Sequence, residues 1–464
     1  MTPTLLLLLV YSLALVGAGV LVARRVKTSA DFFVAGRSLS GTMVFVTLLA
    51  ANIGAGSTVG ASGVGYLHGL SAWWWSGSAA LGCLVLGLFV APRMHRLAAE
   101  KGLLTVGDFL ERRFDRSVRG MISLVLWFGT LSILAGQLIA MAWAFQVIAG
   151  VPKAWGCIVG GVIVVAYFSG GGLLASAWVN LLELCVLLLG FTLALPFAWS
   201  AAGGWQAMRN AAGATQAASY GSFTGMGLSG ILDLAVILVP SFIISPGLIQ
   251  KTFGARTAAG AGAAALGNAA VLAVFAFIPT SLGMAARAVK PGLANPELAL
   301  PTLMTDVLPP WVGGLSLAAL FAAEISTADA ILFMLATSLG RDLYHTFLRP
   351  AATDAELLRV SRWTSAGAGT LGVLLAMALP SVIDALKAFY GVMTVALFVP
   401  LLVGLYSRAA GAREARISVV TAITATLIGR FWLAGSEHAD WGPFALGLGS
   451  GVAVFAGAWL WRSL

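Results

Sequence analysis

Long apolar segments recur along the whole chain, and they constrain its fold more than any other feature. Crossing a bilayer takes about 20 apolar residues in a helix, and about thirteen segments reach or approach that length. Only 10% of the 464 residues are charged, whereas a soluble protein carries roughly 25%. The sequence therefore predicts an all-α polytopic membrane protein, with a single transmembrane domain over residues 1–464. The predicted helices are 4–23, 41–67, 70–92, 118–149, 153–169, 174–200, 226–252, 257–286, 309–340, 361–381, 384–406, 415–434 and 443–461.

The basic residues lie mostly in loops on one side of the predicted membrane. About 21 of the 27 Lys and Arg do so, at residues 24–37, 93–119, 251–256, 341–362, 408–416 and 462. Because positively charged loops stay in the cytoplasm, this pattern predicts a multi-pass protein of the cell (inner) membrane, with its N-terminus outside and its C-terminus cytoplasmic. The net charge of +9 thus reports topology and does not indicate a nucleic-acid partner.

Sequence motifs of enzymes and ATP-driven proteins do not occur. We find no phosphate-binding glycine loop and no HExxH, Ser–Lys or paired-Asp arrangement. Cys83, Cys157 and Cys185 lie in apolar stretches, without the spacing of a metal site or a disulfide framework. We therefore expect neither an enzyme nor direct use of ATP.

Two predicted helices are interrupted near their midpoints. Residues 50–57 (AANIGAGS) place two glycines inside 41–67, and residues 241–247 (SFIISPG) place Pro-Gly inside 226–252. Proline removes a backbone donor and glycine permits non-helical dihedral angles, so the freed backbone groups need protein or a cavity around them. One interruption opens each half of the chain, which is typical of an inverted-repeat transporter with a site at the membrane midplane. A simple kink is the alternative.

The segment 309–340 carries adjacent hydroxyls and two carboxylates, namely Ser326, Thr327, Glu324 and Asp329. Polar atoms in hydrocarbon are costly unless partnered, so such residues usually bind an ion, carry a proton or line a water-filled path. Hydroxyl groups, together with the backbone carbonyls that an interrupted helix frees, are suitable ligands for sodium. Calcium takes more oxygen ligands, and these usually include carboxylates. Alternatively, both hydroxyls bond to carbonyls of their own helix.

Four sequence blocks together resemble the sodium/solute symporter family, which includes sodium-coupled transporters of proline, sugars, sialic acid, pantothenate, iodide and choline. The blocks are residues 31–39 (DFFVAGRSL), 171–180 (GGLLASAWVN), 248–251 (LIQK), and 325–329 (ISTAD) with 341–344 (RDLY). The resemblance implies a LeuT-type fold, in which two inverted repeats of five helices follow one extra helix and precede two more. We therefore expect repeats at about 41–200 and 226–406, with peripheral helices at 4–23, 415–434 and 443–461.

The resemblance also implies a sodium site between the first and eighth helices of this core. Carried over by motif, its ligands are the backbone carbonyls of Ala50, Ile53 and Ala323 and the hydroxyls of Ser326 and Thr327. Sodium is accordingly the expected co-transported ion.

Four further polar residues are expected on the ion pathway or in coupling. Asn52 stands where the proline transporters of the family have Asp, and Asn180 stands where most members have Asp. Asp329 keeps the acid of the motif, but Ala330 replaces its common serine, which argues against a second sodium of the sialic acid transporter type. Glu324 is unusual for the motif, and we expect it to face a vestibule, pair with a basic residue, or titrate.

The substrate cavity is expected beside the two interruptions. Its predicted lining is Gly56, Ser57, Trp75, Ser76, Ser241, Phe242 and Ser245. Ser57 and Ser76 replace the Gln and Glu of the sugar transporters, so an amino acid or a short carboxylate is favoured over a sugar. An aromatic belt at the membrane surface is the alternative role for Trp75 and its neighbours.

These features together predict a sodium-coupled symporter that imports a small organic solute by alternating access. One alternative is a proton-coupled or uncoupled transporter on the same fold, with Glu324 or Asp329 titrating. Another is a solute sensor that does not transport. The expected partners are a small-molecule substrate, sodium and the lipid bilayer.

Overall fold

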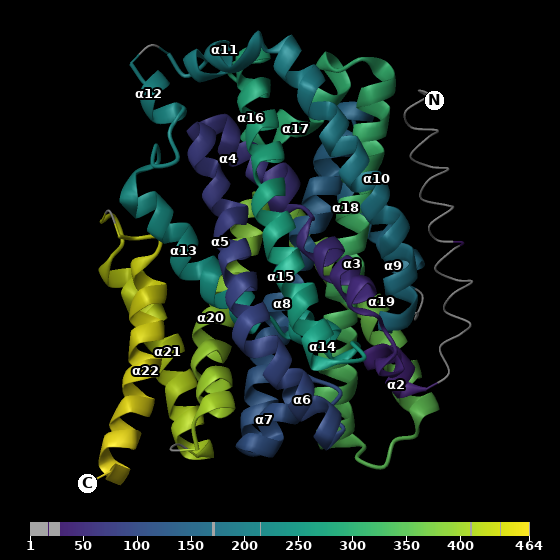
Figure 1. Ribbon diagram of the computed structural model, residues 1–464, viewed down its shortest axis with the longest axis vertical. Coiled ribbons are helices and arrows are strands. Elements are labelled where there is room, and N and C mark those ends of the chain that lie inside the picture. Colours follow the sequence, from purple (N-terminus) through teal and green to yellow (C-terminus); the bar gives the residue numbers. More distant parts are fainter. Residues whose placement is uncertain are drawn as a thin grey trace.

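The computed structural model describes residue 17 and residues 28–168, 172–213, 215–408, 411–436 and 438–463. Within these residues the regular structure is helical, apart from one isolated β-bridge between Leu39 and Ala255. Most helices run along the long axis of the molecule (Figure 1). The predicted all-α class is confirmed, whereas the predicted helix 4–23 lies outside the described residues except for Gly17.

The helices follow the predicted apolar segments, several of which divide into two or more elements. In chain order the elements are α2 (Ser29–Val34), η1 (Ala35–Arg37), α3 (Gly41–Asn52), η2 (Gly56–Gly60), α4 (Ala61–His68), η3 (Gly69–Ala72), α5 (Trp73–Val85), η4 (Leu86–Val90), α6 (Ala91–Lys101), α7 (Val106–Arg113), α8 (Arg116–Ala149), α9 (Lys153–Phe168), α10 (Gly172–Ala201), α11 (Gly204–Asn210), α12 (Ala217–Tyr220), α13 (Gly227–Ile244), α14 (Pro246–Phe253), α15 (Ala258–Phe275), α16 (Phe277–Val289), η5 (Pro296–Leu298), α17 (Ala299–Thr302), η6 (Leu303–Val307), α18 (Pro310–Thr337), η7 (Ser338–Leu348), α19 (Asp354–Ala378), α20 (Val382–Tyr406), α21 (Ala412–Trp432) and α22 (Gly442–Ser463).

Seven helical stretches among the described residues are long and apolar enough to cross a membrane. They are Gly56–Lys101, Arg116–Ala149, Gly172–Ala201, Gly227–Phe253, Ala258–Val289, Pro310–Leu348 and Val382–Tyr406. Shorter apolar helices occupy Gly41–Asn52, Lys153–Phe168 and Gly442–Ala458. The described chain therefore has the helices of a multi-pass membrane protein.

Helix ends depend on local capping as well as on hydropathy. The Asp115 side chain accepts the Val118 N–H at the start of α8, and Gly150 ends that helix with φ 65°. α19 begins at Asp354, well before the predicted start at 361, because Thr353 caps it through the Glu356 N–H. Apolar length alone thus underestimates a helix that continues past the membrane into charged residues.

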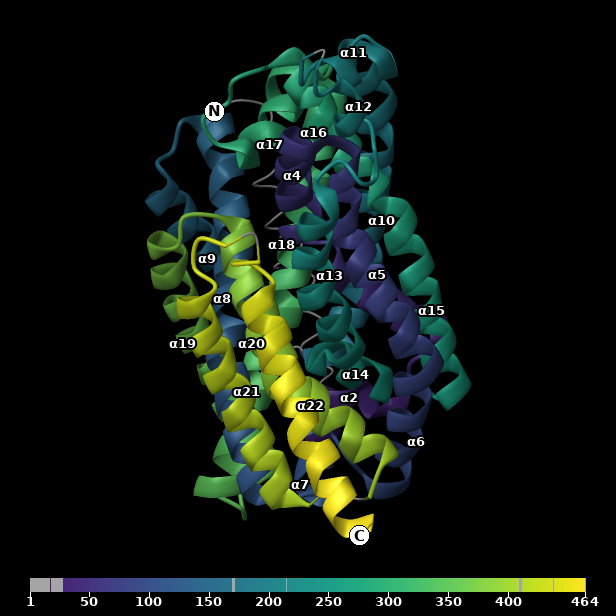
Figure 2. The ribbon, with the colours of Figure 1, turned by 90° about the vertical axis from the view of Figure 1, so that its left-hand side faces the viewer.

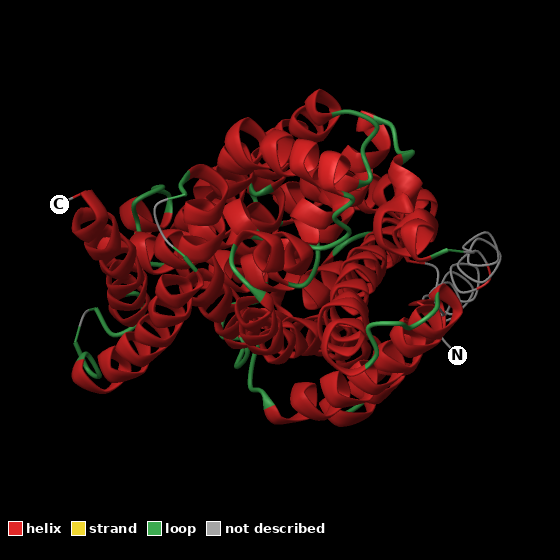
Figure 3. Cartoon of the chain, turned by 90° about the horizontal axis from the view of Figure 1, so that it is seen from below, coloured by secondary structure: helices red, strands yellow, loops and turns green. Residues whose placement is uncertain are grey.

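The central helix of the bundle is α18, which packs against α10, α8 and α3. In the 18-residue apolar stretch by which Pro310–Leu348 qualifies as a membrane span, 94% of the residues are buried. Protein therefore surrounds the carboxylates and hydroxyls of α18, which are kept away from lipid. By contrast, α21 and α22 pack on each other at one side of the molecule, which is the left-hand side in Figures 1 and 3 and faces the viewer in Figure 2.

Candidate functional site

The first predicted interruption is confirmed between α3 and η2. Ile53 has φ −100° and ψ 93°, so the backbone is extended there. The freed amides find side-chain acceptors: Gly54 N–H donates to Ser57 Oγ (3.1 Å), and Ala55 N–H donates to Oε1 of Gln137 on α8 (2.8 Å). The interruption is therefore held by specific polar contacts and is more than a kink.

Glycine at position 54 is required by close packing against α18. A Cβ atom on Gly54 would lie 2.4 Å from Thr327 Oγ1 and 2.6 Å from Gln137 Oε1. Both neighbours are buried, so neither can move away without disturbing the interruption. This glycine lets the hydroxyls of α18 approach the backbone of α3.

Five oxygen atoms converge where α18 meets the end of α3. Ser326 Oγ lies 3.0 Å from Ala50 O and 3.1 Å from Ala323 O, and Thr327 Oγ1 lies 3.2 Å from both Ala50 O and Ile53 O. Each hydroxyl has one proton for two carbonyl contacts, so it either shares that proton between them or leaves one contact without a proton. A cation among these five oxygens would stabilise them better than two shared protons do.

These contacts bear on the two interpretations of the hydroxyl pair. Ser326 does bond back to its own helix through Ala323 O, but it also reaches Ala50 O across the helix interface. Both contacts of Thr327 are to carbonyls of the α3 end. The structure thus brings together all five atoms that the resemblance implied as ligands.

Glu324 faces the same interruption from one turn earlier on α18. Its Oε1 accepts a hydrogen bond from Thr58 Oγ1 (2.9 Å), and Thr58 Oγ1 also lies 2.8 Å from Gly54 O. In the part of the chain that the structure describes, Glu324 Oε2 has no hydrogen-bond partner. The side chain is fully buried, and its contact is with a hydroxyl rather than with a basic residue.

The other predicted pathway residues fall into two places. Asn52 lies at the interruption, where its Nδ2 donates to Asn268 Oδ1 (3.1 Å). Asn180, with its amide nitrogen turned toward acceptors, donates to Ser176 O (3.2 Å) and Glu183 Oε2 (3.1 Å). Ser176 Oγ also donates to Asp329. Asn180 and Asp329 are thus linked through α10 rather than through the first interruption.

The second predicted interruption is confirmed between α13 and α14. Ser245 has φ −51° and ψ 115°, and Pro246 begins the next helix. A Cβ atom on Gly247 would lie 2.4 Å from the Met334 sulfur, the flexible part of a side chain on α18. This interruption also faces α18, but its neighbour is apolar.

Four cavities form a series in which neighbouring cavities share lining residues, and residues of α18 line three of them. A vestibule of about 470 Å³ beside η5 reaches Trp75, which also lines a cavity of about 30 Å³. Asn52 and Thr327 line both this cavity and the next, of about 40 Å³, and Met334 separates that one from a fourth of about 40 Å³. The series passes the oxygen cluster and both interruptions.

The predicted substrate residues divide between these cavities. Gly56, Ser57, Trp75, Ser76 and Phe242 line the cavity of about 30 Å³, and Phe242 and Ser245 line the next one. The seventh residue, Ser241, lies apart. Its Oγ contacts Tyr390 O and Thr394 Oγ1 of α20, each at 2.8 Å.

Sequence reasoning missed Gln137, Asn268 and Lys251 as site residues. Gln137 and Asn268 are polar residues in the middle of predicted spans, a signal that could have found them. Lys251 was matched to a family block and counted among the basic residues of the loops, which is wrong, because it is buried within α14. It is 1% exposed, donates to Thr47 O (3.1 Å) and lines the cavity beside Ser245.

Glu297, which lies outside the spanning helices, accepts hydrogen bonds that connect the elements of the vestibule wall. Its carboxylate accepts hydrogen bonds from Val382 N–H (2.8 Å) at the start of α20 and from Trp143 Nε1 (2.8 Å) on α8. Burial raises the pKa of the Glu297 carboxyl above its usual value, although these hydrogen bonds oppose the shift. Glu297 therefore joins η5 to both helices.

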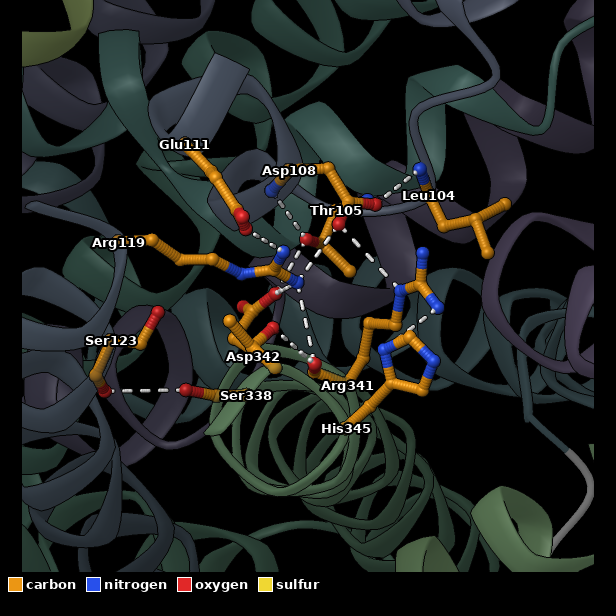
Figure 4. Close-up of polar contacts among 11 residues, drawn as sticks. Leu104, Thr105, Asp108, Glu111, Arg119, Ser123, Ser338, Arg341, Asp342 and His345 are labelled. Carbon is orange, nitrogen blue, oxygen red and sulfur yellow. Dashed lines mark hydrogen bonds and ion pairs between the residues drawn. The ribbon is translucent and has the colours of Figure 1, made fainter. Parts of the chain in front are cut away.

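Charged residues cluster at the C-terminal end of α18, away from the oxygen cluster. Arg119 of α8 forms ion pairs with Asp108 (2.8 Å) and Glu111 (2.6 Å) of α7 and with Asp342 (2.7 Å) of η7. Thr105 Oγ1 adds a 2.6 Å hydrogen bond to Asp342 (Figure 4). This network joins α7 and α8 to the end of α18.

A buried helix bundle with interrupted helices, a converging oxygen site and cavities in series defines a membrane transporter. The chain belongs to the sodium:solute symporter family, which it matches over residues 32–421. This is a family of transporters and not of enzymes.

Individual relatives cover nearly the whole chain. The sodium/glucose cotransporter of Vibrio parahaemolyticus is 26% identical over 461 residues, covering 91% of this chain and 84% of that protein. The sodium/pantothenate symporter of Escherichia coli K12 is 29% identical over 446 residues, covering 90% of each. A solved substrate-bound, outward-open Na⁺-coupled sialic acid symporter aligns with a TM-score of 0.85 at 18% identity, covering 99% of this chain and 98% of that one. This last likeness is one of fold.

Proposed function

We propose that the chain is a sodium-coupled symporter that imports a small organic solute by alternating access. The observation that carries the proposal is the oxygen cluster, where two hydroxyl protons face four oxygen contacts. A sodium ion held by Ala50 O, Ile53 O, Ala323 O, Ser326 Oγ and Thr327 Oγ1 would resolve this mismatch without a carboxylate ligand. Family membership supports the choice of sodium.

Sodium at this position would couple binding to conformation. Its ligands come from α3 and α18, so the ion would hold the interrupted helix against the central helix. At a membrane potential of 100 mV, each entering sodium contributes about 2.3 kcal/mol, which corresponds to a roughly 50-fold solute gradient. Trp75 and Met334, which separate neighbouring cavities, would act as the gates on either side.

An amino acid or a short carboxylate is the solute class that we propose over a sugar. The central cavities are small, at about 30 and 40 Å³, and Trp75, Phe242 and Tyr390 contribute aromatic lining. Their polar groups are few: amides of Asn52 and Gln137, hydroxyls such as Ser57 and Ser76, and the Lys251 ammonium. Such a lining suits a compact solute with one polar end.

The proposed topology places the two interruptions at matching points of two inverted repeats. The repeats would cover about 41–200 and 226–406, within thirteen spans, with 4–23, 415–434 and 443–461 as peripheral helices. The basic loops favour an N-terminus outside and a C-terminus in the cytoplasm of a cell (inner) membrane. The vestibule beside η5 would then open to the outside.

The contacts of Glu324 support a second candidate, a proton-coupled transporter. Thr58 has one hydroxyl proton but lies within bonding distance of both Gly54 O and Glu324 Oε1. A protonated Glu324 would donate a hydrogen bond to Thr58 Oγ1, and the Thr58 hydroxyl would donate to Gly54 O. Each of the two contacts would then have its own proton. Uptake that follows pH in sodium-free buffer, and that Glu324→Gln abolishes, would favour this candidate.

The sodium site can be tested with the double variant Ser326→Ala/Thr327→Ala. We expect sodium, compared with potassium, to raise the thermal midpoint of the native protein and to drive solute uptake in proteoliposomes. Losing two of five ligands should weaken sodium binding about 100-fold, since each buried hydrogen-bonding group contributes roughly 1–3 kcal/mol. Stabilisation by sodium should then vanish at ordinary concentrations.

A matched control is Ser316→Ala/Thr337→Ala on the same helix. Both hydroxyls are buried; Ser316 bonds to Val312 O and Gly190 O, and Thr337 Oγ1 has no partner among the described residues. This control should keep its sodium dependence. Unchanged sodium dependence in Ser326→Ala/Thr327→Ala would refute the proposed site.

A further inference from the structure

A large cavity at the opposite end of the molecule from the vestibule is lined mainly by positive charge. It measures about 700 Å³ and lies between α6, α7 and the end of α20. Six of its lining residues are basic and one, Glu100, is acidic. The basic residues are Arg93, Arg96, Lys101, Arg112, Arg113 and Arg408.

Acidic side chains of the protein compensate little of the positive charge in this cavity. Across the described ranges of the chain, no ion pair involves Arg93, Arg96, Lys101, Arg112 or Arg408. An unpaired cluster of like charges repels itself, so it destabilises the protein unless an anion binds there.

The acidic and the basic residues of the short helix α7 have different surroundings. Its acidic residues, Asp108 and Glu111, pair with Arg119 (Figure 4), whereas its basic residues, Arg112 and Arg113, line the cavity. One helix thus supplies a satisfied ion-pair network on one side and, on the other, Arg112, which forms no ion pair among the described residues. The charge in the cavity is available to a ligand.

Two of the guanidinium groups are held in position. Arg113 donates to Gly404 O (3.1 Å) and Ser407 O (2.7 Å) at the end of α20. The Arg93 guanidinium lies 4.5 Å from the ring centroid of Tyr406, whose hydroxyl donates to Phe89 O (2.7 Å). Guanidinium groups fixed in this way match the oxygens of a phosphate group.

Exposed apolar side chains continue from the cavity along the helix that leads into α6. Leu84, Leu88 and Phe89 are 42%, 51% and 58% exposed, and Phe89 lies one turn before Arg93. In a membrane-spanning helix such exposed apolar residues face acyl chains. The phosphate-binding groups and the lipid-facing surface are therefore continuous.

We propose that this cavity binds the phosphate headgroup of an anionic phospholipid. The headgroup would lie among Arg93, Arg112 and the neighbouring cations, and the acyl chains would run over Leu84, Leu88 and Phe89. This site is separate from the sodium and solute path and does not depend on the transport activity.

The test is native mass spectrometry of the purified full-length protein in neutral detergent, titrated with phosphatidylglycerol, phosphatidylcholine or glycerol 3-phosphate. The native protein should retain phosphatidylglycerol in preference to the other two. In Arg93→Gln/Arg112→Gln, the half-saturating phosphatidylglycerol concentration should rise roughly 30-fold, since each basic residue near the lipid surface contributes a several-fold gain in affinity.

The matched control is Arg359→Gln/Arg362→Gln on α19. It removes the same charge from two exposed arginines that form no ion pair among the described residues, and it should bind phosphatidylglycerol like the native protein. Equal weakening in the two double variants, or no weakening in either, would overturn the site. Equal binding of phosphatidylcholine would overturn the anionic preference, and equal binding of glycerol 3-phosphate would show that the ligand is a soluble phosphate.

Discussion

The two helix interruptions use similar backbone chemistry but meet different neighbours. At the first, the freed backbone groups of residues 50–55 meet Ser326, Thr327 and Gln137. At the second, Gly247 approaches the thioether of Met334, and the adjacent cavity is mostly apolar, although Asn52, Lys251 and Thr327 also line it. An interruption thus supplies free backbone groups, and the side chains packed against it decide whether they form a polar site or a bend beside a cavity.

Both interruptions face the same helix. Thr327 and Met334 are seven residues apart on α18 and therefore lie on one side of it, about two turns apart. An element that contacts both interruptions can transmit a change at one to the other. The comparison is tested most directly by placing equal perturbations at each interruption.

The largest effect is expected for Gly54→Ala at the first interruption. Its Cβ atom would lie 2.4 Å from Thr327 Oγ1, forcing α3 and α18 apart. We expect the free energy of unfolding to fall by about 1–3 kcal/mol and sodium-dependent stabilisation to disappear. Thermal unfolding across a sodium titration measures both; a native sodium response would contradict the proposed role of this close contact.

An intermediate effect is expected for Gln137→Leu, which removes the 2.8 Å hydrogen bond that the buried Ala55 N–H donates to Gln137 Oε1. Losing this hydrogen bond should cost about 1–3 kcal/mol of stability, and half-maximal stabilisation should require more sodium. The matched control is Gln250→Leu near the second interruption, where Gln250 Nε2 donates to Phe33 O (3.2 Å). Denaturant unfolding with and without sodium should show similar losses of stability, with an altered sodium response only in Gln137→Leu.

The smallest effect is expected for Gly247→Ala at the second interruption. The new Cβ atom would approach the Met334 sulfur, and a flexible thioether can move aside, so the loss of stability should stay below about 1 kcal/mol. Sodium-dependent uptake into proteoliposomes should persist. If Gly247→Ala abolishes the sodium response as completely as Gly54→Ala, the proposed difference between the two interruptions is wrong.

Much of the architecture could be predicted because its signals are local. Apolar length gave the positions of α8, α10 and α20, and the Gly and Pro residues near 54 and 246 gave both interruptions. Helix ends such as the start of α19 were missed, because capping and charged extensions are independent of hydropathy. The importance of Gln137 was missed because its partner, Ala55 N–H, is freed only by the interruption.

The sequence by itself determined the membrane class, the two weak points in the backbone and, through motif resemblance, the family and the atoms expected around sodium. Only the tertiary structure decided that these atoms meet, since Ser326 and Ala50 are 276 residues apart in the chain. It also gave Glu324 a hydroxyl partner and, within the described part of the chain, left five basic residues of the cavity beside α7 without an ion pair: Arg93, Arg96, Lys101, Arg112 and Arg408. Hydropathy and backbone propensity act over a few residues, whereas converging oxygens and isolated charges depend on how distant helices pack.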